Sequence, residues 1–255
     1  MGLGFATAQA CLKAGARVVI CARGEPDVRA AVNELKKAGN VDGIRADVTS
    51  TRDIEAALDL VESRFGPLTS LVHAAAVPGP IGEFTGVKPD EWLETVRINL
   101  FGTFLTARQS CIRMKPRGGR IVLFSGGGAA GPLPDFTAYA CAKAGVARLA
   151  ETIALEMAPY GIAVNCLAPG LVATRMMAQS VAAGHRTDKD PVPAALGAEA
   201  AAFMLSDEAE GITGKFVAAP HDGWREWPEH LPELNGTDIF TLRRIVPRDR
   251  GMDWQ

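Results

Sequence analysis

Tyr139 and Lys143 are the residues best suited to acid–base chemistry in this 255-residue chain. A spacing of four places the phenol and the ammonium one turn apart on the same face of a helix. A neighbouring cation favours the phenolate, so we expect the pKa of Tyr139 to fall from about 10 toward neutrality. Such a phenol can exchange a proton with a carbonyl or alcohol oxygen. The same pair also occurs on solvated helices without a catalytic role, so the rest of the chain must decide whether this pair is catalytic.

The elements around this pair follow an alternating pattern. Short apolar runs alternate with longer segments of helical period, which is typical of parallel strands joined by crossover helices. The expected strands cover residues 17–21, 44–48, 71–75, 120–124, 162–167 and 215–219. We therefore predict an α/β fold of Rossmann type, a doubly wound parallel sheet with helices on both faces, as a single domain over residues 1–223. Residues 171–197 lack a clear period and are predicted to form a substrate lid.

Ligands bind beyond the carboxyl ends of the strands in such a sheet. The groups that follow the predicted strands are Arg23, Asp47, the turn at residues 73–76, Ser125 and the Pro169-Gly170 pair. Their common position indicates one site at this edge of the sheet.

The chain resembles the short-chain dehydrogenase/reductase family. The matching segments are Gly2-Leu3-Gly4, Ala46-Asp47-Val48, Asn99 to Thr103, Arg120 to Ser125, Tyr139 with Lys143, and Asn165 to Gly170. The resemblance spans Gly2 to about Gly223 and implies NAD(P)-dependent interconversion of a carbonyl and a secondary alcohol. A 3-oxoacyl compound or a related small ketone is the implied substrate, and a homodimer or homotetramer the implied assembly. It also implies that Tyr139 is the acid–base residue, that Lys143 lowers its pKa and binds the nicotinamide ribose, and that Asn99 supports a proton-relay water.

The family's fourth catalytic residue, a serine that orients the substrate carbonyl, stands thirteen residues before the tyrosine, where this chain has Gly126. Ser125 comes one residue early. Because strand side chains alternate between faces, Ser125 reaches the substrate only if the backbone bends. The run Gly126 to Gly128 permits such a bend. Ser125 is therefore either a catalytic residue or a turn hydroxyl that bonds nearby backbone.

The resemblance also implies the residues that bind the cofactor. They are Gly2, Leu3, Gly4, Arg23, Asp47, Val48, Ala74, Ala75, Tyr139, Lys143, Pro169 and Gly170. Arg23 stands where the family selects the cofactor, and guanidinium suits the additional phosphate of NADP(H), although NAD(H) remains possible. Asp47 either accepts from the adenine amino group or caps a turn. His73, in place of a family asparagine, is expected to be a satisfied interior histidine.

The family's first strand and first glycine are not found ahead of Gly2 and Gly4. That strand is central in a doubly wound sheet, and its loss would leave unpaired backbone on both sides. Two explanations compete: a start assigned too late, which we favour, or a real loss. The second would also suit a non-catalytic nucleotide-binding or scaffold protein with the same fold. Sugar-nucleotide epimerase or dehydratase chemistry shares the Tyr/Lys pair but needs a larger substrate-binding portion.

Composition narrows the function classes further. A net charge of −2 offers no broad basic surface for nucleic acid or anionic lipid. The five cysteines are odd in number and lack metal-ligand spacing, so we expect no disulfide framework and no metal site, and most of them to be buried. No long apolar run or signal peptide is seen, which leads us to expect a soluble cytoplasmic protein acting on a small molecule.

Two further segments bear on the substrate. An apolar pocket wall is expected from Pro132, Leu133, Pro134, Phe136, Met176 and Met177, and an anion contact from His185, Arg186 and Lys189. The extension over residues 224–255 carries three tryptophans and a helical pattern at 238–245. We expect it to pack on the domain or on a neighbouring subunit, because it is too aromatic for a disordered tail.

Overall fold

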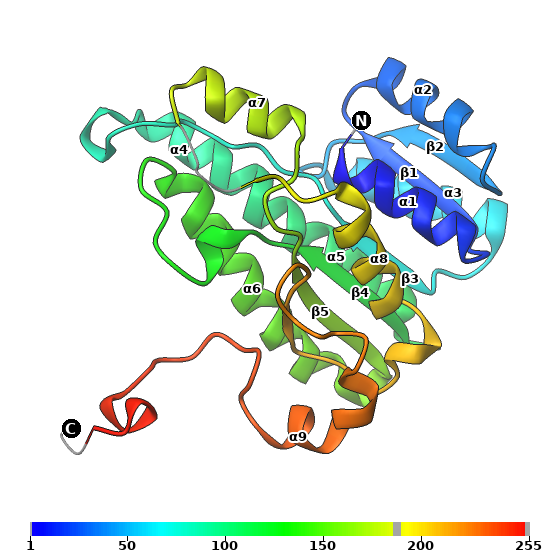
Figure 1. Cartoon of the computed structure of the whole chain (residues 1–255). Helices are drawn as coiled ribbons and strands as arrows, with labels where there is room; N and C mark the ends of the chain where they lie inside the picture. Colours follow the sequence, from blue (N-terminus) through cyan, green and yellow to red (C-terminus); the bar gives the residue numbers. More distant parts are fainter. Residues whose placement is uncertain (1, 186–189, 253–255) are drawn as a thin grey trace.

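The computed structural model describes residues 2–185 and 190–252, and within them strands and helices alternate (Figure 1). The strands are β1 (Val18–Ala22), β2 (Val41–Arg45), β3 (Ser70–His73), β4 (Gly119–Phe124), β5 (Ile162–Ala168) and β6 (Phe216–Ala218). The helices are α1 (Leu3–Lys13), α2 (Glu25–Leu35), α3 (Thr51–Phe65), α4 (Pro89–Val96), α5 (Gly102–Met114), α6 (Thr137–Met157), α7 (Arg175–Ala182), α8 (Ala194–Met204) and α9 (Leu231–Gly236). All paired strands are parallel. The predicted α/β class is confirmed.

The strands form two hydrogen-bonded groups. β1 pairs with β2, and β3, β4, β5 and β6 follow one another in a four-stranded sheet. In the described part of the chain, β1 and β3 do not pair with each other. Apolar side chains on these two strands, such as Ile20 and Val72, are only half-buried, whereas Val122 and Val164 in the interior strands are 0% exposed. A further central strand stays a prediction.

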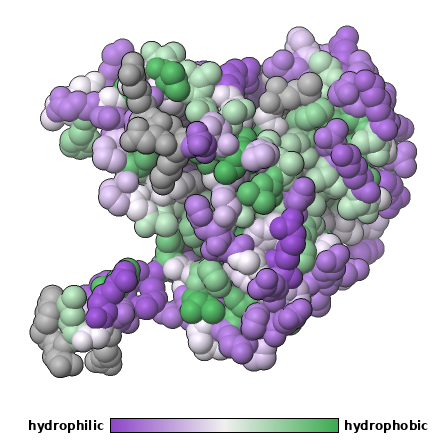
Figure 2. All heavy atoms as spheres, viewed as in Figure 1, coloured by the Kyte–Doolittle hydropathy of each residue, from purple (hydrophilic) through white to green (hydrophobic). Residues whose placement is uncertain are grey.

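Helices cover both faces of the four-stranded sheet, as a doubly wound fold requires. On one face, α3, α5 and α6 bury Ile54, Met114 and Val146 against β4 and β5. On the other face, α8 packs over Val122 and Leu167 together with the start of the C-terminal extension. Figure 2 shows polar residues over α2 and along the projecting C-terminal segment, with apolar residues toward the middle of this view. The sheet edge that carries the site is thus held between two packed layers.

The element boundaries match the expected ones only in part. The predicted capping box at the start of α3 is confirmed, since the Ser50 hydroxyl accepts a hydrogen bond from the Asp53 N–H (3.2 Å). The second strand ends at Arg45 instead of residue 48, because the Asp47 side chain closes a turn by accepting from the Thr49 N–H (2.8 Å). The lid segment is not without regular structure: it contains α7.

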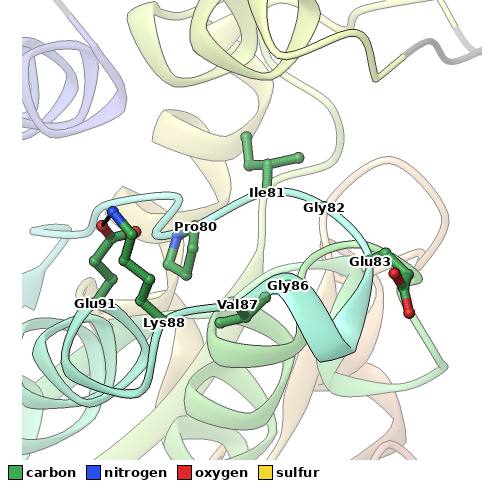
Figure 3. Close-up of a pocket in the computed structure, with 8 residues that line it drawn as sticks. All are labelled: Pro80, Ile81, Gly82, Glu83, Gly86, Val87, Lys88 and Glu91. Atoms are coloured by element: carbon green, nitrogen blue, oxygen red, sulfur yellow. Dashed lines mark hydrogen bonds and ion pairs between the residues drawn. The ribbon is translucent and has the colours of Figure 1, made fainter.

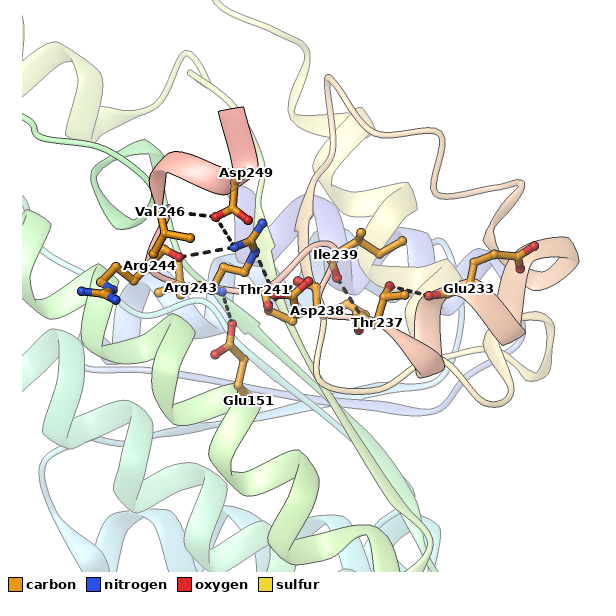
Figure 4. A network of polar contacts seen from close by, with 12 residues as sticks. Glu151, Glu233, Thr237, Asp238, Ile239, Thr241, Arg243, Arg244, Val246 and Asp249 are labelled. Atoms are coloured by element: carbon orange, nitrogen blue, oxygen red, sulfur yellow. Dashed lines mark hydrogen bonds and ion pairs between the residues drawn. The ribbon is translucent and has the colours of Figure 1, made fainter. Parts of the chain in front are cut away.

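The C-terminal extension runs along the edge of the sheet beside β6. Trp224 and Trp227 are buried against α8 and β6, and the Phe216 N–H donates to the Phe240 carbonyl (2.7 Å). This strand-like contact and the positive φ of 56° at Phe240 explain why the helix predicted at 238–245 does not form. Arg243 then bridges Asp238 and Asp249 on the segment that projects from the body (Figure 4).

Of the five cysteines, Cys111 and Cys166 are buried, so the expectation that most are interior was wrong. Within residues 2–185 and 190–252 no three His, Cys, Asp or Glu side chains are grouped to hold a metal ion. No helix in the same ranges is long and apolar enough to cross a membrane.

Candidate active site

The candidate acid–base pair lies where α6 meets the carboxyl end of β4. Lys143 is 2% exposed, and its ammonium lies 5.8 Å from the centre of the Tyr139 ring, consistent with one helical turn. The Lys143 Nζ donates a hydrogen bond to the Phe124 carbonyl (2.8 Å). The last residue of β4 therefore fixes the lysine, while α6 fixes the tyrosine beside it.

The electrostatics of the pair differ from the sequence-based expectation. Burial raises the pKa of Tyr139 to about 12, so the expected fall toward neutrality is wrong for this structure. Burial also lowers the pKa of Lys143 to about 8, because the ammonium loses its hydration. The expectation counted the attraction of the cation and left out desolvation, which outweighs it here. The Tyr139 phenol thus stays protonated across the physiological pH range.

Asn99 lies on a π-helical turn (Arg97–Phe101) between α4 and α5. It is 0% exposed, and its amide holds both backbone groups of Val77: Nδ2 donates to the Val77 carbonyl and Oδ1 accepts from the Val77 N–H, each at 2.8 Å. This turn packs closely on α6, since a Cβ added at Gly145 would lie 2.9 Å from Leu100. Asn99 therefore ties the loop after β3 to the π-helical turn that packs on α6, the helix of Tyr139.

Ser125 and Gly126 point in different directions at the end of β4. The Ser125 hydroxyl is 4% exposed and donates to the Lys143 backbone carbonyl (2.8 Å). A Cβ added at Gly126, by contrast, would lie 2.8 Å from the Tyr139 Oη. The residue that faces the phenol is thus Gly126, and Ser125 makes the local backbone bond that was the second alternative.

The predicted cofactor-binding residues of α1, β3 and β5 gather at one edge. A Cβ at Gly4 would lie 3.4 Å from Ala74, and one at Gly197 would lie 3.3 Å from Leu3 and 2.7 Å from Pro169. A Cβ at Gly2 would meet no atom of the described residues within 4 Å. Backbone N–H groups at a helix start suit phosphate, and small residues allow its close approach. The binding of a dinucleotide pyrophosphate at this edge stays a prediction.

The adenosine end of the predicted site carries charged groups. Asp47 accepts from both the N–H and the hydroxyl of Thr49 (2.8 Å each). These bonds, with smaller contributions from the charges of Arg23 and Arg97, hold the pKa of Asp47 below its ordinary value. The turn-capping alternative is therefore present in the structure, and Arg23 lies close enough to act on the carboxylate. Val48 packs at the start of α5, where a Cβ at Gly102 would lie 2.7 Å away.

His73, the last residue of β3, is buried and only partly satisfied: it makes a backbone hydrogen bond at Ala75. It is 3% exposed, and its Nε2 has no hydrogen-bond partner among the described residues. Burial, and then the charge of Lys143, lower the pKa of His73 to about 3. The imidazole is therefore a neutral neighbour of Lys143. The expectation of an interior histidine holds, and that of a satisfied one holds only in part, because Nε2 has no partner among the described residues.

Two loops stand beside the site. The loop between β3 and α4 encloses a small hollow lined by Pro80, Ile81, Gly82, Glu83, Gly86, Val87, Lys88 and Glu91 (Figure 3). The Gly82 N–H donates to the Asp135 carbonyl (3.0 Å), which joins this loop to the segment before α6. In the second loop, the ring of His185 contacts the ring of Phe136 edge-on, with 4.7 Å between the ring centroids. Met176 and Met177 are half-buried in α7, and Arg186 and Lys189 lie outside the described residues.

Sequence reasoning missed three features of the site. The π-helical turn at Asn99, the bond from Lys143 to Phe124 and the unpartnered His73 nitrogen carry no separate sequence signal. The sequence carried one signal of a change beside the phenol, which is the glycine at position 126, thirteen residues before Tyr139.

Comparisons with known proteins agree with this arrangement. A family model described as enoyl-(acyl carrier protein) reductase matches residues 1–220. The short-chain reductase protein NovJ of Streptomyces niveus is 33% identical, with 88% of this chain and 85% of NovJ covered. An inactive 2-(S)-hydroxypropyl-CoM dehydrogenase 2 of Xanthobacter autotrophicus is also 33% identical, over 81% of this chain and 94% of that protein.

Among solved structures, the actinorhodin polyketide ketoreductase with NADPH superposes with a TM-score of 0.80 at 30% identity. The match covers 85% of this chain and 91% of the ketoreductase. The parallel sheet, the Tyr/Lys pair on α6 and these relatives lead to one conclusion. The chain belongs to the short-chain dehydrogenase/reductase family of oxidoreductases.

Proposed function

We propose that this protein interconverts a small ketone and a secondary alcohol with NADP(H), using Tyr139 as the acid–base residue. The observation that carries the proposal is the placement of Tyr139 and Lys143 on one face of α6, against the carboxyl end of β4. A 3-oxoacyl compound or a related small ketone is the proposed substrate class.

The chain's own residues have distinct tasks in this reaction. Gly2, Leu3, Gly4, Ala74, Ala75, Pro169 and Gly170 would hold the cofactor at the sheet edge, which when bound supplies or accepts a hydride. Tyr139 gives its proton to the carbonyl oxygen in reduction and takes it back in oxidation. Lys143 places a positive charge beside the phenol and stabilises the phenolate that remains. Asn99 holds the loop after β3 in register with α6 through both Val77 bonds.

The preference for NADP(H) rests on Arg23, which follows β1 and interacts with Asp47. A guanidinium can bind the additional phosphate through two parallel hydrogen bonds. We also propose that copies of the chain associate. Large apolar side chains are exposed on α4, the π-helical turn and α5, among them Leu93, Phe101, Phe104 and Ile112.

The test is a fluorescence titration with NADPH and NADH, followed by turnover of Tyr139→Phe. We expect at least about tenfold tighter binding of NADPH, since a charged hydrogen-bonded contact is typically worth about 1.5–3 kcal/mol. We expect Tyr139→Phe to bind NADPH as the wild type does and to lose turnover. Normal turnover in Tyr139→Phe would contradict the role of the phenol.

A second candidate is a nucleotide-binding protein of the same fold without catalysis. It is favoured by Gly126 at the phenol and by the inactive relative reported above. Under this alternative, NADPH binds but no carbonyl compound is reduced, and Tyr139→Phe leaves the biological role unchanged. The retained Tyr139, Lys143 and Asn99 favour the enzyme.

A further inference from the structure

Gly126 packs directly against the reactive end of Tyr139. A Cβ at this position would lie 2.8 Å from the phenol oxygen and 3.5 Å from two ring carbons. The backbone here is extended, with φ of −170° and ψ of 175°, a conformation open to any residue type. The chain conformation therefore does not require glycine. The glycine instead leaves the space beside the Tyr139 phenol oxygen free of a side chain at position 126.

The end of β4 presents no side-chain hydroxyl to this space. Ser125 donates to the Lys143 carbonyl, and Lys143 donates to the Phe124 carbonyl, both at 2.8 Å. The Asn99 amide is engaged with the backbone of Val77. These three side chains thus have protein partners, and among the described residues Tyr139 is the donor left to polarise a carbonyl placed over Gly126.

This arrangement has a consequence for the substrate. As the carbonyl carbon gains the hydride of the reduced nicotinamide, the C=O π electrons move to oxygen, and that oxygen takes the Tyr139 proton. The substrate gains two electrons and the cofactor loses two. A donor aimed at the developing oxyanion is typically worth about 10²–10³ in rate. Electron-withdrawing neighbours make that oxyanion less basic, so an activated carbonyl depends less on a second donor.

Resting on the function proposed above, we propose that Gly126 makes this enzyme selective for activated carbonyls, such as 1,2-diketones, quinones and α-fluorinated ketones, over plain ketones. The selectivity arises because, among the described residues, Tyr139 is the donor that acts at the carbonyl oxygen, and a serine at 126 would add another. Gly126 is thus a specificity-determining position.

The test compares Gly126→Ser with Gly126→Ala, which adds the same Cβ without the hydroxyl. Single-turnover oxidation of bound NADPH at 340 nm is measured with 2,3-butanedione against 2-butanone, and with trifluoroacetophenone against acetophenone. We expect the ratio of activated to plain ketone to be at least tenfold smaller in Gly126→Ser than in Gly126→Ala. Equal ratios in the two variants would overturn the inference.

If the variants do not fold, the wild type decides. Its rates across para-substituted acetophenones should depend on the substituent more steeply than borohydride reduction in water does, and an equal or shallower dependence overturns the inference. NADPH binding with no turnover of any of these carbonyls would instead overturn the proposed function. The two failures are therefore distinguishable.

Discussion

Replacing His73 with glutamine should reduce the acid sensitivity of the fold. The imidazole is 3% exposed at the end of β3, and burial with the Lys143 charge lowers its pKa to about 3. In the unfolded chain a histidine titrates near 6.5. Between these values the unfolded state binds more protons than the folded state, so stability falls as the pH drops below about 6.5.

The size of the effect follows from the two pKa values. At pH 5, protonation of the unfolded histidine lowers the free energy of unfolding by about 2 kcal/mol relative to pH 7. Glutamine removes this titration and keeps a polar side chain in the strand. We therefore expect the loss of stability from pH 7 to pH 5 to be about 2 kcal/mol smaller in His73→Gln than in the wild type.

Urea denaturation at both pH values measures this difference, whatever stability the variant has at pH 7. His230→Gln is the matched control, because His230 is exposed on the C-terminal extension and should leave the difference unchanged. An equal loss of stability in His73→Gln and the wild type would refute the claim that His73 stays neutral in the folded protein.

Four further substitutions test other parts of the structure. Gly170→Ala should cost about 3 kcal/mol, because φ is 84° and the new Cβ would lie 2.6 Å from Pro220. Gly15→Ala, with φ of 88° but open space around the new Cβ, should lower the free energy of unfolding by about 1 kcal/mol in the same urea titration. Equal losses in the two variants would contradict the close contact of Gly170 with Pro220. Lys215→Met should speed amide exchange over residues 234–242, since the buried ammonium donates to the carbonyls of that segment, and unchanged protection would count against this. Arg23→Ala should weaken NADPH binding about tenfold or more and leave NADH binding unchanged, as paired titrations would show.

Much of the fold was predictable because its signals are local. The Ser50 and Asp53 capping box marks the start of α3, and the apolar runs mark β4 and β5. The tail helix at 238–245 was wrong because the backbone of that segment pairs with β6, a contact between residues far apart in sequence. The end of the second strand was likewise set by a side-chain bond of Asp47.

The site was predictable in its residue types but not in its energetics. The spacing of four correctly placed Tyr139 and Lys143 on one helical face. The direction of the Tyr139 pKa shift depends on burial by several elements, which spacing does not contain. The same holds for Ser125, whose partner on α6 appears only when the strand and the helix are packed together.

The central claim is hydride transfer to a carbonyl carbon with the proton supplied by Tyr139. It is tested most directly with 2,3-butanedione and NADPH that carries deuterium at both C4 positions. The alcohols formed by the wild type and by Tyr139→Phe are analysed by mass spectrometry. We predict one deuterium at the new carbinol carbon in the wild-type product, and a rate at least about 100-fold lower in Tyr139→Phe, since a positioned proton donor is worth about 10²–10⁴. No deuterated alcohol from wild-type protein that binds NADPH, or equal rates in the two proteins, would contradict it.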